Sequence, residues 1–142
     1  MYEQSFHYLL MATHMTFQKK FLSSIKNYGL TVGQPKILDH LYYHNGISQK
    51  ELAFGCHIEP ASLTSLLNRM EKDKLIERRI LNGNRRTFYI FLTDRGMEIA
   101  KQVTTAFLPL EEQIFDGISD EERSKFLETF WKLYKNITNE EK

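Results

Sequence analysis

Two short helices followed at once by a β-hairpin are the feature that most constrains how this chain can fold. Ser48-Gln49-Lys50-Glu51 has the pattern of a helix-capping box and predicts a helix that reaches about Cys56. Glu59-Pro60 predicts the start of a second helix, because proline is tolerated in a first turn and an acid suits the positive end of the helix dipole. Two helices joined by so short a stretch, residues 56–59, predict a helix-turn-helix.

The hairpin is predicted from two β-rich runs, residues 76–80 and 87–92. Between them, Asn82-Gly83-Asn84 supplies residues that tolerate the positive φ angles of a tight turn. A hairpin directly after a helix-turn-helix makes a winged helix, with the wing at about residues 76–92. The same stretch carries four arginines: Arg78, Arg79, Arg85 and Arg86.

Longer helices are predicted before this segment. Apolar residues recur at helical spacing through residues 3–27, and Gly29 is the expected stop. Thr31 followed by Gln34 is a further capping-box pattern, which predicts a helix through about Tyr43.

Two more helices are predicted after the hairpin. Thr93-Asp94 predicts a cap for a helix to about Gly117, which Pro109 is expected to kink or break. Ser119 predicts a capped last helix, whose apolar positions are Phe126, Phe130, Leu133 and Ile137. The expected fold is mainly α, an α+β winged helix in a single domain over residues 1–142.

The charge of the chain is small overall but uneven. The formal net charge is +1, yet residues 59–95 hold eight Lys or Arg against five Asp or Glu. The single cysteine, Cys56, excludes an internal disulfide and suits a reducing compartment. No secretory signal and no membrane-spanning apolar run is evident, so we expect a cytoplasmic protein with no membrane partner.

The second short helix has two contrasting faces. One is apolar, with Leu63, Leu66, Leu67 and Met70 at helical spacing. The other is small and polar, with Ala61, Thr64, Ser65, Asn68 and Lys72. Side chains of this kind can approach base edges in the DNA major groove, which is about 12 Å wide. Arginines on the adjacent hairpin would reach phosphates or a neighbouring minor groove, where the negative potential is focused.

Four stretches carry a resemblance to a known family: LTVGQPKIL at 30–38, SQKELA at 48–53, EPASLTSLLNRMEKDKLIERR at 59–79 and NRRTFYIFLTDRG at 84–96. Their order and spacing resemble the multiple antibiotic resistance regulator (MarR) family of winged-helix transcription factors. The family's wing signature is matched at Arg86, Leu92-Thr93 and Gly96. Asn84 stands where the family has an aspartate, so the wing tip is more cationic than usual. Lys74 stands where a glycine is usual, which bears on the turn after the second helix.

The resemblance implies a homodimeric repressor that binds a pseudo-palindromic double-stranded DNA site and responds to a ligand. Residues 1–29 and 97–142 would supply the dimerisation helices, and residues 30–96 the DNA-binding lobe. On the matching positions, Ser62, Thr64 and Ser65 would face bases, Asn68 and Arg69 bases or backbone, and Arg86 the minor groove. Position 65 is often arginine in the family, so the sequence preference is expected to differ.

Further DNA contacts are predicted close to these residues. Gln49 and Lys50, at the start of the preceding helix, are candidate phosphate contacts. Arg85 is expected at DNA beside Arg86. Arg78 or Arg79 would contact DNA or pair instead with Glu77 or Asp73.

Several alternatives stay open at this point. The arginines could serve a winged-helix protein–protein module without DNA readout. The aromatic residues of the first and last helices predict a core and dimer interface, or a pocket for a small aromatic or lipophilic effector. We expect Cys56 to be a buried, inert thiol rather than a redox sensor, and the pair His40 and His44 to be a helix face rather than a metal site. No catalytic constellation or cofactor is predicted.

Overall fold

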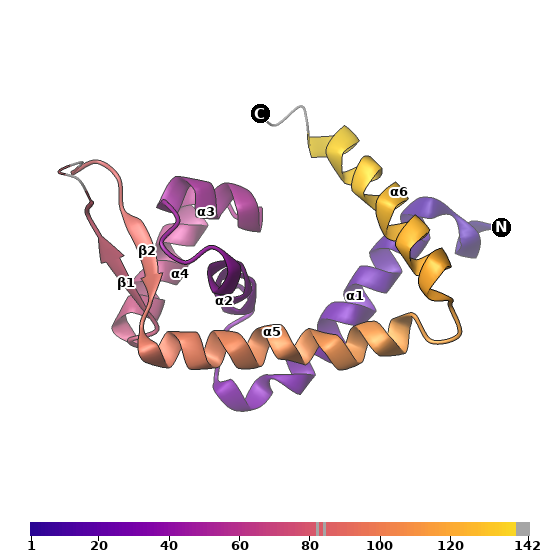
Figure 1. Ribbon diagram of the computed structural model, residues 1–142, viewed down its shortest axis with the longest axis horizontal. Coiled ribbons are helices and arrows are strands. Elements are labelled where there is room, and N and C mark those ends of the chain that lie inside the picture. The colour runs from indigo at the N-terminus through magenta and orange to yellow at the C-terminus, as the bar shows by residue number, and fades with distance from the viewer. Residues whose placement is uncertain (82, 84, 139–142) are drawn as a thin grey trace. The chain divides into compact units, whose positions relative to one another are not determined.

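The computed structural model describes residues 1–81, 83 and 85–138 (Figure 1). The chain divides into two compact units, Met1–Leu108 and Pro109–Lys142. In chain order the helices and strands are α1 Phe6–Ser24, α2 Gln34–Tyr43, α3 Gln49–Cys56, α4 Pro60–Lys72, β1 Ile76–Arg79, β2 Tyr89–Leu92, α5 Asp94–Ile114 and α6 Asp120–Thr138. Short 3-10 turns at Tyr2–Gln4 and Lys26–Tyr28 flank α1.

The first unit contains the winged helix that the sequence predicts. The hairpin β1–β2 stands beside α3 and α4 (Figure 1). The two strands are antiparallel, with Ile76 opposite Leu92 and Arg79 opposite Tyr89. The segment before α3 pairs with β2 through an isolated antiparallel bridge between Ser48 and Tyr89, and the N–H of Ile90 donates to the carbonyl of Ile47 at 2.9 Å. The helix-turn-helix and its wing are therefore joined by backbone hydrogen bonds.

The core lies where α2, α3 and α4 meet the hairpin and α5. Its largest side chains are fully buried: Ile37, Leu38, Leu41, Leu52, Leu63, Leu67, Met70, Ile76, Ile90 and Val103. Three of the four residues of the apolar stripe predicted on α4 are buried, and Leu66 is half-buried. Burying this stripe leaves the opposite, polar face of α4 exposed, because the two faces follow the same helical period.

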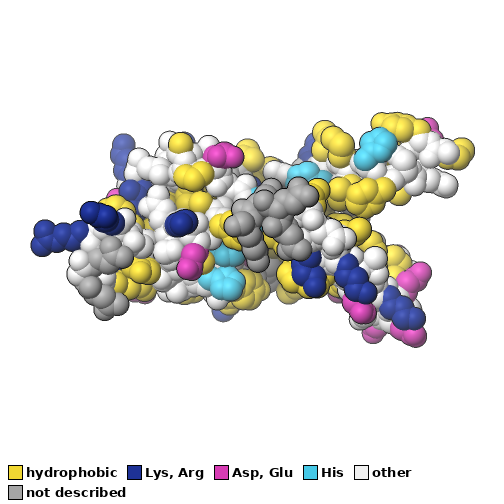
Figure 2. Space-filling model, turned by 90° about the horizontal axis from the view of Figure 1, so that it is seen from above, with side chains coloured by type: hydrophobic (Ala, Val, Ile, Leu, Met, Phe, Trp, Pro, Cys, Tyr) yellow, Lys and Arg dark blue, Asp and Glu magenta, His cyan; other side chains and the backbone are white. Residues whose placement is uncertain are grey.

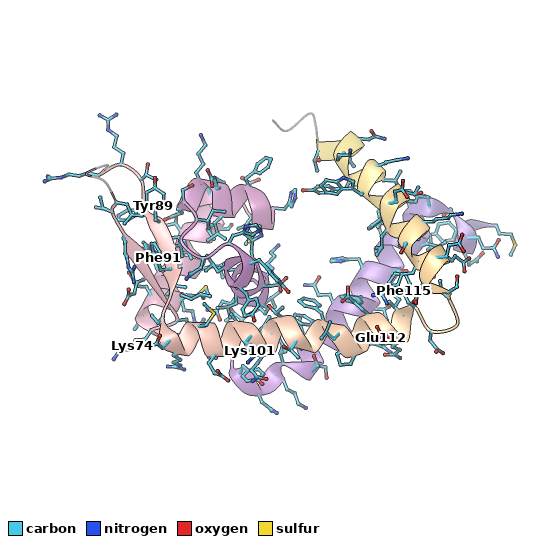
Figure 3. All side chains as sticks on the ribbon, in the orientation of Figure 1. Lys74, Tyr89, Phe91, Lys101, Glu112 and Phe115 are labelled. Atoms are coloured by element: carbon cyan, nitrogen blue, oxygen red, sulfur yellow. The ribbon has the colours of Figure 1, made fainter. Side chains whose placement is uncertain are left out.

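A Schellman motif ends α4. The N–H of Lys74 donates to the carbonyl of Glu71 at 3.0 Å, and that of Leu75 donates to Met70 at 2.9 Å. Lys74 has φ 62°, in the left-handed region that favours glycine. The exit turn thus has the geometry of a glycine turn although a lysine occupies it, and Lys74 lies at the base of the wing (Figure 3).

The start of α5 is fixed against this turn. The Thr93 hydroxyl accepts a hydrogen bond from the Gly96 N–H at 3.0 Å and donates to the carbonyl of Lys74 at 2.6 Å. The carbonyl oxygen of Leu75 lies so close to Gly96 that a Cβ at this position would overlap it. These contacts explain why a threonine followed three residues later by a glycine closes the wing.

Several element boundaries differ from the prediction. The predicted capping box at Thr31 is wrong: α2 begins at Gln34, the Thr31 hydroxyl caps nothing, and only the Gln34 side chain reaches back, to the Thr31 N–H at 3.1 Å. The strands are shorter than the predicted runs at 76–80 and 87–92. Pro109 does not break α5, which continues through it to Ile114. A single missing N–H is therefore tolerated in this helix.

The second unit holds the end of α5 and the whole of α6. The predicted cap at Ser119 is confirmed: its Oγ accepts from the N–H of Glu122 at 3.1 Å. Arg123 lies over the Phe115 ring, 4.3 Å from its centroid, and 3.4 Å from a Glu112 oxygen (Figure 3). Large apolar side chains of α6 are exposed in the single chain: Phe126, Leu127, Phe130, Trp131, Leu133, Tyr134 and Ile137. Of the helices described, none is both long and apolar enough to span a bilayer.

Candidate nucleic-acid interface

The exposed face of α4 carries the side chains that the sequence predicts for base contact. Ser62, Thr64, Ser65, Asn68 and Arg69 are all exposed. They lie opposite the buried stripe, on a helix whose N-terminal turn starts at Pro60. The surface is therefore one helix wide, polar and free of large side chains near its start, as a helix that enters a major groove requires.

A hydrogen-bond chain ties the start of α3 to this face. Gln49 Nε2 donates to Thr64 Oγ1 at 3.1 Å, and that hydroxyl in turn donates to the carbonyl of Pro60 at 3.0 Å. Thr64 therefore uses its proton within the helix, and its oxygen accepts from Gln49. The predicted phosphate contact Gln49 is half-buried, whereas Lys50 beside it is exposed.

A second link joins the wing to α4. Arg78 Nη2 donates to Asn68 Oδ1 at 2.6 Å. Arg78 is half-buried, and Asn68 is exposed. Because the donor is a cation, this is a short, charge-assisted hydrogen bond.

Arg79 is held within the wing. Its guanidinium lies 2.9 Å from a Glu77 oxygen and 4.2 Å from the centroid of the Phe91 ring. Phe91 lies on β2 directly opposite Glu77 (Figure 3). Arg79 thus makes the predicted pairing with Glu77, while its contact with DNA stays a prediction.

The wing tip carries the remaining arginines. Arg85 and Arg86 are both exposed. Figure 2 shows Lys and Arg side chains gathered around the end of the hairpin. Asn84, the departure from the family signature, lies outside the described residues. Near the C-terminal end of α4, Arg69 Nε lies 4.0 Å from Asp73 Oδ2. Because both side chains are exposed, this ion pair contributes little to stability.

An open depression that the sequence does not predict lies on the wing. It measures about 810 Å³ and is lined by the end of α4, by β1 and by the start of α5. Glu71, Lys74, Glu77, Asp94 and Arg95 give it mixed charge. Because no single sign dominates and the depression is wide open, it does not resemble an enclosed ligand pocket.

The two candidate sensors lie in the helix-turn-helix core. Cys56 is buried, and its Sγ lies 3.6 Å from the carbonyl oxygen of Lys36. Burial raises the pKa of the Cys56 thiol to about 11, so the nucleophilic thiolate is scarce at neutral pH. The His40 and His44 rings are in contact, with centroids 4.6 Å apart and planes tilted by 32°. In the part of the chain that the structure covers, no three His, Cys, Asp or Glu side chains are grouped to hold a metal ion.

Comparison with known proteins shows which family this chain resembles. Residues 30–88 match the model of the MarR family. The uncharacterized HTH-type transcriptional regulator YwhA of Bacillus subtilis is 31% identical over 97 residues, which cover 68% of this chain and 70% of YwhA. The HTH-type transcriptional repressor MdtR of the same organism is 30% identical over 87 residues, 61% of this chain and 56% of MdtR. The chain thus spans little more than half of this second relative.

The fold also matches that of a solved structure from this family. A putative MarR family regulator from Listeria monocytogenes, solved in complex with a 26mer DNA, superposes with a TM-score of 0.90 over 96% of this chain and 91% of that one, at 17% identity. The predicted helix-turn-helix and the first part of the wing fall within the segment that matches the family model, whereas β2 lies just beyond it. This chain belongs to the MarR family of transcriptional regulators.

Proposed function

We propose that the protein is a repressor that binds a pseudo-palindromic DNA operator as a homodimer. The observation that carries the proposal is the exposed polar face of α4 beside a wing tip with two exposed arginines. An α-helix fits the major groove, and arginines favour the negative potential of an adjacent minor groove. The protein would act by binding, without catalysis, in the cytoplasm where its DNA target lies.

In this proposal each protomer contributes one set of contacts. Ser62, Ser65 and Asn68 read base edges, while Arg69 and Lys50 reach the backbone. Arg85 and Arg86 enter or flank the minor groove. Thr64 and Gln49 have a different part: their mutual hydrogen bond keeps the start of α3 and the start of α4 in a fixed relation at the DNA surface.

The homodimer is proposed from exposed apolar side chains. On α1, Phe6, Met11 and Met15 are 60, 63 and 69% exposed. On α6, Trp131 and Ile137 are 56 and 75% exposed. Such apolar helix faces are typical of surfaces that a partner covers. We therefore assign residues 1–29 and 97–142 to dimerisation and residues 30–96 to DNA binding.

Response to a small aromatic or lipophilic effector is part of the proposal. It is supported by the family assignment and by the aromatic stack of Phe21 on Phe107, with centroids 4.0 Å apart between α1 and α5. An effector that binds one arrangement of the two half-site helices better than another would change operator affinity.

The direct test is selection of duplexes from a random pool with the purified protein. We expect recovered duplexes to share an inverted repeat, and sedimentation to show two chains per duplex. Screening of phenolic compounds for release of the selected duplex then tests the effector. Failure to retain any duplex at low salt, with a folded and dimeric protein, would favour the protein–protein module instead.

A further inference from the structure

We propose that Arg78 sets the base preference of Asn68 and directs it to an acceptor edge, guanine O6 and N7, instead of adenine. Arg78 is then a positioning residue and not a DNA contact. The inference rests on the proposed DNA binding, and it goes further by naming which base one residue reads and which residue decides it.

The geometry links two separate elements at one point. Arg78 lies on β1 opposite Ile90, and Asn68 lies on the exposed face of α4. Their contact, Nη2 to Oδ1, is 2.6 Å long. A hydrogen bond of this length with a cationic donor is among the stronger ones at a protein surface. The side chain of Asn68 is thereby fixed from the wing side before any DNA arrives.

Chemistry also fixes which way the amide faces. A guanidinium has five N–H donors and no acceptor, so the Asn68 atom facing Arg78 must be the carbonyl oxygen. The amide NH₂ is the other end of the same planar group. Among residues 1–81, 83 and 85–138, no partner is found for that NH₂. Asn68 therefore presents hydrogen-bond donors that its own protein does not use.

This orientation disfavours the usual pairing of asparagine with adenine. That pairing needs the carbonyl oxygen to accept from adenine N6 while the NH₂ donates to N7. In this chain the oxygen already accepts from Arg78, and the positive charge repels a second donor such as the adenine amino group. The same charge polarises the amide and strengthens its N–H donors. Guanine, with acceptors at both O6 and N7, is the base edge that suits such a group.

Arg78 is poorly placed to contact a phosphate. It is half-buried, its Nη2 is committed to Asn68, and its Nε is buried without a hydrogen-bond partner in the described structure. An arginine that neutralised a phosphate would add to affinity for every sequence. An arginine that orients a reading side chain changes the preference at one base pair only. This difference makes the two roles separable by experiment.

The experiment compares the unaltered chain with four variants, on duplexes selected with the unaltered chain. Arg78→Met keeps a stem of similar length and removes the donors, Asn68→Ala removes the acceptor, and the double variant combines them. Arg85→Gln is the matched control for an arginine at the wing tip. Each is titrated against the selected duplex and against duplexes with a single base pair replaced symmetrically in both half-sites. Thermal unfolding of each variant excludes gross misfolding.

We expect the unaltered chain to prefer guanine over adenine at one symmetric pair of positions by on the order of tenfold. Arg78→Met and Asn68→Ala should each lose this preference, and the double variant should lose no more than either. All three should keep the preferences at other positions and the salt dependence. Arg85→Gln should instead weaken all duplexes alike and flatten the salt dependence.

Three results would overturn the proposal: adenine preferred at the position that Asn68→Ala relaxes, additive losses in the double variant, or a uniform loss with Arg78→Met like that of Arg85→Gln. Each of these leaves DNA binding intact. If the unaltered chain selects no duplex at all, the proposed function itself fails, and this outcome is distinct from the other three.

Discussion

The hydrogen bonds of Thr93 hold the wing base to the start of α5, and replacing this residue by alanine tests how much they stabilise. Thr93→Ala removes the cap on the Gly96 N–H and the bond to the Lys74 carbonyl. Loss of an N-cap costs about 1 kcal/mol, and loss of a further hydrogen bond a similar amount. Because Thr93 is half-exposed, water can partly replace the lost hydrogen bond to the Lys74 carbonyl, which reduces the loss of stability. We expect the free energy of unfolding to fall by about 1.5 kcal/mol.

Urea denaturation followed by circular dichroism measures this change, and a heating curve should show a midpoint lower by about 3–6 °C. Thr93→Ser is the matched control, because it keeps the hydroxyl and loses only a methyl group. It should retain most of the stability. If the serine variant is as unstable as the alanine variant, the methyl group and not the hydrogen bonds fastens the wing, and the reasoning is refuted.

Three further predictions concern the helix-turn-helix. Lys74→Gly should raise the free energy of unfolding by about 0.5–1 kcal/mol in urea titrations. Glycine removes the backbone strain of a lysine in the left-handed region, and this gain exceeds the conformational entropy that glycine adds to the unfolded chain. A destabilised variant would contradict this prediction. Burial, aided by the neighbouring His44, lowers the pKa of His40 below its usual 6.5, so stability should fall as pH drops below about 6.5. His40→Gln should flatten that fall in denaturation at pH 7 and pH 5. With its thiol pKa at about 11, Cys56 should resist a thiol reagent until urea unfolds the protein, and peroxide should leave duplex affinity unchanged.

The sign of the His40 prediction follows from which state binds the proton. In the folded protein the imidazole binds it less readily than in the unfolded chain. Protonation therefore favours unfolding, and the loss begins near pH 6.5 and is complete below the lowered pKa. Near His40, Asp39 opposes this effect, and its carboxylate also accepts a hydrogen bond from Thr104 at 2.9 Å.

Local signals in the sequence predict the helix starts well. Ser48 and Ser119 each cap a helix through the N–H three residues on, a bond that needs no distant partner. The order of helix, turn, helix and hairpin is likewise local and is confirmed. The failure at Thr31 has a local cause too: residues 31–34 form a turn, with the Gln34 N–H donating to the Thr31 carbonyl, and the helix begins only after it.

The links between elements could not be predicted in the same way. Gln49 meets Thr64, and Arg78 meets Asn68, across 15 and 10 positions of sequence and between different elements. Their partners depend on how α3, α4 and β1 pack, which no spacing rule gives. The sequence alone does not decide between DNA and an acid as the partner of Arg79, because the contact of Arg79 with Phe91 depends on strand register.

The proposed role of the wing tip is tested most directly by the salt dependence of duplex binding. The selected duplex is titrated at several salt concentrations with the unaltered chain and with Arg86→Ala. If both wings of a dimer neutralise phosphates, removing the two Arg86 side chains should reduce the slope of log affinity against log salt by about 1.8. An unchanged slope and affinity in Arg86→Ala, with the variant folded and dimeric, would contradict a wing that contacts DNA.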